Sequence, residues 1–160
     1  MVLSLTQKER MLLEDQKKHE QICIDKYNNY ASQAQDPQLK TLFQQYAAQE
    51  QQHLDSINQM LNGQVPAAGQ GGSQSQQQSQ PAGQTMPSPM QGAMGNQTDA
   101  ALCSDMLMTE KYISGTYDTT IFEFVDTNAR QVLNHIQKEE QQHGEGIFNY
   151  MKNHGMYNPQ

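Results

Sequence analysis

The sequence predicts an all-α fold, a four-helix bundle made of two helical hairpins that a long linker joins. Apolar residues recur along four stretches at the spacing of one helix face, and no stretch alternates with the period of two that marks a strand. A five-residue motif also recurs at an offset of 90 residues, from positions 49–53 to positions 139–143. A repeated supersecondary unit of this kind predicts a pseudo-twofold arrangement of the two hairpins.

The first hairpin is predicted over residues 1–63. Thr6 with Glu9 three residues later is the capping-box pattern of a helix start. Asp36-Pro37 marks the turn, because Asp favours the N-cap and Pro favours the first helical position. Asn62-Gly63 is the pattern of a helix C-terminus and closes the hairpin.

The second hairpin is predicted over residues 98–160. It is expected to open near Thr98-Asp99, to turn around Asp126–Asn128 and to end at His154-Gly155. No Gly or Pro marks the turn. The two hairpins together are expected to form one bundle.

The linker is predicted over residues 64–97, which contain no charged residue and four of the six prolines. Such a segment cannot bury enough apolar surface to offset its ordering entropy, so we expect a disordered crossover. A flexible chain of this length spans about 32 Å (r.m.s.). That reach permits a connection along the bundle, which makes the second and third helices parallel, and equally a homodimer in which two chains exchange hairpins.

The composition excludes several classes of function. Ten Lys and Arg against seventeen Asp and Glu give a net charge of −7, which argues against nucleic-acid binding. No apolar run is long enough for a transmembrane helix, and the N-terminus lacks a signal-peptide pattern, so we expect synthesis in the cytoplasm and no membrane partner. The two cysteines, Cys23 and Cys103, are too few for a disulfide framework or a thiolate zinc site and are expected to be buried thiols.

Acidic side chains lie on the apolar faces of the predicted helices, where charge is unexpected. Each hairpin carries one Glu and, 30 residues later, a Glu-x-x-His motif, and these positions lie at nearly equal distances from the turn. Counting along the helices therefore brings the ionisable residues to one level near mid-helix. Six residues are the candidate site: Glu20, Glu50, His53, Glu110, Glu140 and His143.

Four carboxylates inside a bundle require neutralisation, because desolvating one ionised group costs several kcal/mol and the four repel one another. The lysines nearest in sequence point off the stripes. Two divalent cations would supply four positive charges, with neutral imidazoles completing the ligands, and Glu-x-x-His suits this because residues i and i+3 share a helix face. Other interpretations stay open: a solvated helix face, or a vestigial, metal-free site in which some glutamates are protonated.

Glu followed by Glu-x-x-His, occurring twice on a four-helix bundle, resembles the ferritin-like di-iron and di-manganese carboxylate proteins. The resemblance implies a dinuclear iron or manganese site in which Glu50 and Glu140 bridge the two ions. Members commonly place a tyrosine seven residues after the first Glu, near the metals, and Tyr27 and Tyr117 match that position. A tyrosine there is also ordinary core packing.

The C-terminal segment resembles the Coat F domain of spore coat proteins from endospore-forming bacteria. The resemblance covers about 60 residues and rests on four stretches: Thr109-Glu110-Lys111-Tyr112, Glu139-Glu140-Gln141-Gln142-His143, Ile147-Phe148-Asn149-Tyr150-Met151 and His154-Gly155-Met156-Tyr157. It implies location in the spore coat, with other coat proteins as partners, and does not imply an enzymatic activity.

Two functions follow as hypotheses. The first is a structural spore coat or spore-associated protein that carries a dinuclear Fe or Mn site. The alternative is a dinuclear metalloenzyme acting on peroxide or dioxygen, as a catalase or an oxidase. No four-cysteine module supplies an electron relay, which favours reactions that need none.

Overall fold

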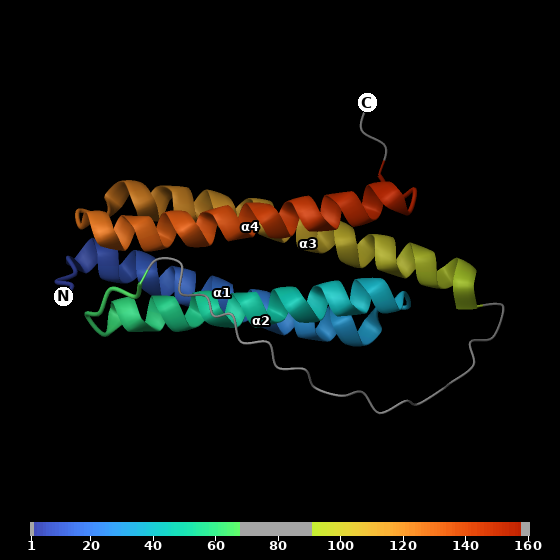
Figure 1. Ribbon diagram of the computed structural model, residues 1–160, viewed down its shortest axis with the longest axis horizontal. Helices are drawn as coiled ribbons and strands as arrows, with labels where there is room; N and C mark the ends of the chain where they lie inside the picture. Colours follow the sequence, from blue (N-terminus) through green and yellow to red (C-terminus); the bar gives the residue numbers. More distant parts are fainter. Residues whose placement is uncertain (1, 68–90, 158–160) are drawn as a thin grey trace.

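The computed structural model describes residues 2–67 and 91–157, with side chains over 2–67 and 99–157. Helices account for most of this part of the chain: α1 (Gln7–Gln33), α2 (Pro37–Leu61), α3 (Gln91–Glu123) and α4 (Thr127–Asn153). Helices α1 and α2 pack as one hairpin and α3 and α4 as the other (Figure 1). The predicted all-α four-helix bundle is therefore confirmed over the described residues.

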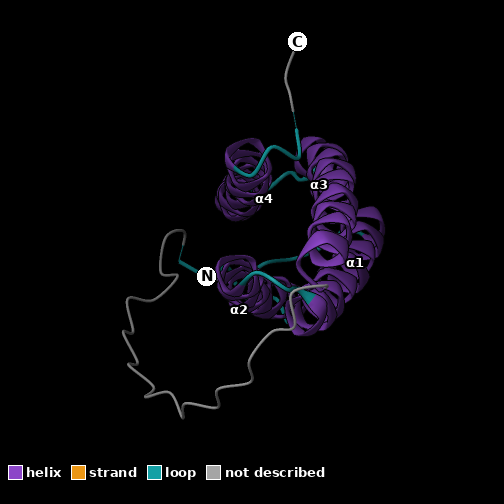
Figure 2. Cartoon of the chain, turned by 90° about the vertical axis from the view of Figure 1, so that its right-hand side faces the viewer, coloured by secondary structure: helices purple, strands orange, loops and turns teal. Residues whose placement is uncertain are grey.

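The four helices stand at the corners of a four-sided bundle (Figure 2). Across the two hairpins α1 packs on α3 and α2 packs on α4. Helices α2 and α3 run in the same direction, as the long connection between them predicts (Figure 1). Most of the predicted linker, residues 68–90, lies outside the described residues. The prediction that this segment is disordered therefore stays a prediction. Within the described ranges no helix is both long enough and apolar enough for a transmembrane span.

Helix α3 begins earlier than the sequence predicts. It starts at Gln91, inside the segment 64–97 assigned to the linker, rather than near Asp99. The buried carboxylate of Asp99 does not cap this helix. Instead it accepts hydrogen bonds from the backbone N–H groups of Gln35 (2.9 Å) and Asp36 (3.0 Å) in the α1–α2 turn. The Asp99 side chain therefore binds the α1–α2 turn instead of capping a helix, and α3 extends upstream to Gln91.

The other predicted helix ends are confirmed. The capping box at α1 is complete, since Thr6 accepts from the N–H of Glu9 (3.1 Å) and the Glu9 carboxylate accepts from the N–H of Thr6 (2.7 Å). Asp36 caps α2 and Asp126 caps α4. Two glycines with left-handed φ follow the C-terminal ends of α2 and α4: Gly63 (82°) and Gly155 (68°).

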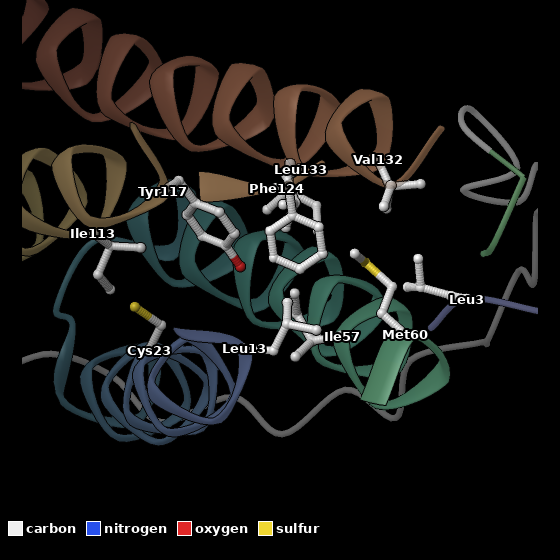
Figure 3. Packing of buried hydrophobic residues seen from close by; sticks show 12 residues of the cluster. Leu3, Leu13, Cys23, Ile57, Met60, Ile113, Tyr117, Phe124, Val132 and Leu133 are labelled. Carbon is white, nitrogen blue, oxygen red and sulfur yellow. The ribbon is translucent and has the colours of Figure 1, made fainter. Parts of the chain in front are cut away.

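Two apolar clusters fill the bundle. The first, shown in Figure 3, contains Leu13 of α1, Ile57 and Met60 of α2, Phe124 at the end of α3 and Leu133 of α4. The second lies toward the α1–α2 turn and contains these side chains among others: Tyr27, Phe43, Met106, Ile147 and Met151. Along α2 and α4 the Glu-x-x-His motifs fall between residues of one cluster and residues of the other. Cys23 and Cys103 are buried free thiols, as predicted.

Candidate metal centre

The site is built from the repeated Glu-x-x-His motif on α2 and α4. The Glu and the His of each copy are three residues apart, so they project from the same face of their helix. Helices α1 and α3 each add one glutamate. The structure buries all six predicted side chains, none more than 2% exposed: Glu20, Glu50, His53, Glu110, Glu140 and His143.

The six side chains form two overlapping groups of four. One group is Glu20, Glu50, His53 and Glu140, and the other is Glu50, Glu110, Glu140 and His143. Within each group the candidate ligand atoms lie within 4.8 Å of one another. Glu50 and Glu140 belong to both groups, which is the arrangement expected of carboxylates that bridge two ions.

The Nδ1 atom of His53 faces three carboxylates. It lies 3.0 Å from Oε2 of Glu50, 3.7 Å from Oε2 of Glu20 and 2.7 Å from Oε1 of Glu140. A single N–H satisfies only one acceptor, so a hydrogen on Nδ1 leaves the others without a donor. Convergence of oxygen lone pairs on one ring nitrogen is the geometry of a cation site.

The second imidazole repeats this arrangement in part, with two carboxylates at its Nδ1 atom. Nδ1 of His143 lies 3.1 Å from Oε1 of Glu50 and 3.4 Å from Oε1 of Glu110. The two imidazole rings are stacked, with centroids 5.9 Å apart. Each ring therefore presents the same nitrogen to the carboxylates, as the internal repeat requires.

Four carboxylate oxygens of the site are buried without a hydrogen-bond partner: Glu20 Oε2, Glu110 Oε2, Glu140 Oε1 and Glu140 Oε2. Glu140 Oε1 lies 2.7 Å from Nδ1 of His53 but does not form a hydrogen bond with it. An orphaned buried acceptor is costly, and natural proteins hold few of them. The nearby lysines do not relieve it, because Lys111 and Lys138 are exposed and Lys26 pairs with Asp105 at 2.8 Å. The orphaned oxygens and the carboxylate and imidazole donors fit two bound divalent cations.

Two buried tyrosines hold the outer glutamates. The hydroxyl of Tyr27 on α1 donates to Oε1 of Glu110 on α3, and the hydroxyl of Tyr117 on α3 donates to Oε1 of Glu20 on α1. Both contacts cross from one hairpin to the other and are reciprocal. Each leaves the second carboxylate oxygen, Oε2, free to face the site.

Two partners of the histidines were not predicted. Nε2 of His53 lies 2.6 Å from Oε2 of Glu139, and Nε2 of His143 lies 2.6 Å from Oε1 of Gln49. Such contacts on the outer ring nitrogen are typical of metal-binding histidines, because they fix the tautomer and the ring orientation. Both partners directly precede a motif glutamate, and this is the only signal of them that the sequence carries.

The remaining histidines lie outside the site. Nε2 of His135 lies 3.4 Å from Oε1 of Glu139, and the His154 ring stacks on Tyr150 with centroids 4.0 Å apart. His19 is half-buried against Tyr112 on the α1–α3 face. His154 is the most exposed of the three, and His19 and His135 are half-buried.

The electrostatics of the site follow from burial and crowding. Burial raises the pKa of Glu50 well above its usual range, and the charge of Glu20 adds to this rise. Burial raises the pKa of Glu140 as well, together with the charge of Glu50. Burial alone would lower the pKa of His53, but its carboxylate partners, first among them Glu139, raise it. In the metal-free protein, protons thus occupy the positions for which metal ions would compete.

Glu110 behaves differently from the bridging glutamates. Burial acts to raise its pKa, but hydrogen bonding from His143 and Tyr27 outweighs burial and lowers the pKa. Burial raises the pKa of Tyr27, and the neighbouring Glu110 raises it further, so the tyrosine stays a neutral donor. The outer ligand is therefore favoured as a carboxylate, which is the form that binds a metal.

A groove of about 790 Å³ runs along the outer side of α3 and α4. Two residues of the site, the buried Glu110 and Glu140, form part of its wall together with the apolar Leu107 and Phe148. A glycine, Gly144, lies between these side chains on α4. The groove thus brings an open surface next to the buried site.

Comparison with known proteins assigns the C-terminal part of the chain. Residues 98–160 match the family model of the Coat F domain. This segment is similar to Coat F domains over its whole length. No curated protein and no solved structure matches the chain. The match covers less than half of the chain and indicates an association with the spore coat.

The Coat F domain alone does not complete the site. It supplies Glu110, Glu140 and His143, and the hairpin outside the match supplies the other three side chains. Each group of four takes three residues from one hairpin and one from the other. The site therefore depends on the assembly of both hairpins.

Proposed function

We propose that this chain is a spore coat protein and holds a dinuclear iron or manganese centre inside its bundle. The observation that carries the proposal is the set of four buried carboxylate oxygens without a hydrogen-bond partner, which face two imidazoles. Two divalent ions balance the charge of four carboxylates. They also give every orphaned oxygen a partner.

The donor set favours iron and manganese among divalent ions. Each position offers carboxylate oxygens and one imidazole nitrogen, a mixture that suits both metals, and no thiolate. When bound, such ions supply redox and Lewis-acid chemistry. The chain's own residues would hold that centre: Glu50 and Glu140, which belong to both groups, would serve both ions, while Tyr27 and Tyr117 fix the outer carboxylates.

Elemental analysis of the purified chain tests the proposal. We expect two ions of iron or manganese per chain after expression with both metals or after reconstitution. The double variant E50A/E140A should lose both ions, because both residues belong to both groups. E14A, at an exposed position of α1, is the matched control and should keep them.

The result that contradicts the proposal is equally direct. A wild-type protein that stays metal-free after reconstitution with Mn²⁺ and Fe²⁺, while circular dichroism shows a folded helical bundle, would exclude the centre. The buried glutamates would then be protonated, and the protein would be a structural coat protein alone.

A second candidate function is chemistry on peroxide or dioxygen at this centre. The groove lined by Glu110 and Glu140 favours it, because it brings an open surface next to two of the buried candidate ligands. Disproportionation of hydrogen peroxide into water and dioxygen needs no external reductant. Oxygen release from peroxide by the loaded wild type, absent from E50A/E140A, would support this function, and no release would exclude the catalase form of it.

We propose other coat proteins and a second copy of the chain as partners, including a dimer that exchanges hairpins. Large exposed apolar side chains support association: Met108, Tyr112, Phe122 and Val125. Light scattering of the purified chain gives its mass in solution. A mass of one chain at all concentrations would exclude self-association.

A further inference from the structure

The two copies of the motif differ at one position. The first reads Gln49-Glu50-Gln51-Gln52-His53 and the second reads Glu139-Glu140-Gln141-Gln142-His143. Only the leading residue changes, from an amide to a carboxylate of nearly the same size. This difference lies next to two similar sets of candidate ligands.

The bundle places each leading residue against the histidine of the other copy. Glu139 of α4 contacts Nε2 of His53 on α2 at 2.6 Å, and Gln49 of α2 contacts Nε2 of His143 on α4 at 2.6 Å. The contacts have equal length and involve the same ring atom. The two histidines therefore differ in the charge of their partner and not in the presence of one.

A carboxylate and an amide act differently on an imidazole. Glu139 only accepts, so a hydrogen of His53 lies on Nε2, and Nδ1 is the nitrogen that would bind a metal ion in place of a proton. A carboxylate partner also increases the basicity of the ligating nitrogen. The amide of Gln49 orients His143 but carries no charge.

Several other features of the two positions match. Each position has one outer glutamate held by a tyrosine of the other hairpin, and both share Glu50 and Glu140. One further difference is the ring of Tyr46, which stacks on His143 with centroids 4.3 Å apart.

We propose that the two metal positions are inequivalent, and that Glu139 makes the position at His53 the tighter one. The inference rests on the proposed dinuclear centre and assigns Glu139 as a positioning residue of that centre. If it is correct, the tighter position is always the one whose histidine contacts a carboxylate, whether that histidine is His53 or His143.

Single-position variants measure the two affinities separately. Glu110 belongs only to the position at His143 and Glu20 only to the position at His53. E110A thus keeps the position next to Glu139, and E20A keeps the position next to Gln49. Titration with Mn²⁺, with free Mn²⁺ followed by its electron paramagnetic resonance signal, should give about tenfold or more tighter binding in E110A than in E20A.

Exchanging the two partners provides the decisive control. E139Q combined with E110A should lose that advantage, and Q49E combined with E20A should gain it. In the double exchange Q49E/E139Q the order of the two positions should reverse, although Tyr46 stays where it is. If circular dichroism shows that E139Q/E110A or Q49E/E20A does not fold, the other of these two variants still tests whether the carboxylate sets the affinity.

The outcomes separate this inference from the proposal beneath it. Binding of no Mn²⁺ by the wild type contradicts the dinuclear centre itself. Binding of two ions with equal affinity, or with an order that the exchange leaves unchanged, overturns the role of Glu139 and leaves the centre in place.

Discussion

The hydroxyl of Tyr27 on α1 donates its hydrogen to Glu110 on α3, and both side chains are buried. The contact joins two helices of different hairpins beside one candidate metal position. It also removes one carboxylate oxygen from the set that needs a partner. Tyr27 therefore couples the packing of the hairpins to the orientation of a ligand.

Removal of this hydroxyl should weaken one metal position. We expect Y27F to bind the second ion about tenfold less tightly, because Glu110 loses the donor that orients it. Mn²⁺ titration measures the change. Y112F, on the exposed side of α3, is the control and should bind like the wild type. Unchanged affinity in Y27F would show that the tyrosine serves only as core packing.

Metal removal should lower the stability of the fold. An ion present at a hundred times its dissociation constant stabilises the native state by about 2.7 kcal/mol if it does not bind the unfolded chain. Thermal unfolding of the loaded protein with and without a chelator measures this difference. E50A/E140A should give the same midpoint in both conditions, and an equal midpoint for the wild type would contradict the prediction.

The bundle could be predicted because most of its signals are local. The capping box at Thr6, the N-caps Asp36 and Asp126 and the apolar stripes each depend on residues within a turn or two. Helical spacing also places the repeated glutamates and histidines on the buried faces. The structure brings these residues together because both hairpins set them at the same level.

The remaining features depend on contacts between distant segments. Asp99 satisfies the α1–α2 turn, 64 residues away at Gln35, and no local pattern separates that role from a helix cap. Glu139 reaches His53 across 86 residues. Glu139 directly precedes Glu140 in the sequence, which places it near the site. Only the packing of α2 against α4 shows that it contacts His53 and not His143.

Glu9 should make the stability depend on pH. Burial raises its pKa, but hydrogen bonds from the backbone of Val125 and Thr6 outweigh burial, so the pKa lies below its usual 4.5. A group whose pKa is lower in the folded state stabilises the fold above the unfolded pKa and loses that contribution as the pH falls through the folded pKa. We therefore expect a loss of stability on acidification below about pH 4.5.

The variant E9Q isolates this contribution. An amide oxygen can replace only one of the two acceptors that bind Thr6 (2.7 Å) and Val125 (2.9 Å). We expect a loss of about 1–3 kcal/mol near neutral pH and a flatter dependence between neutral and acidic pH. Urea unfolding across this range measures both effects, and E14Q on the exposed side of α1 is the control. A pH profile parallel to that of the wild type would assign the acid sensitivity to other groups.

Gly146 should be intolerant of any side chain. A Cβ at this position would lie 1.8 Å from the hydroxyl of Tyr46, whose ring stacks on His143. G146A must therefore displace Tyr46, and we expect a destabilisation of about 1–3 kcal/mol from overpacking. Because Tyr46 covers the ring of a candidate ligand, the same change should weaken metal binding at His143.

Gly115 is the matched control for this variant. A Cβ there meets no atom within 4 Å, and Ala is the better helix former, so G115A should stabilise the protein by about 0.5–1 kcal/mol. Removing the hydroxyl in Y46F/G146A should restore part of the lost stability, since that atom is the nearest to the new methyl group. Thermal unfolding and Mn²⁺ titration of the three variants give both readouts. Equal stability of G146A and G115A would mean that Tyr46 moves without cost and does not hold His143 in place.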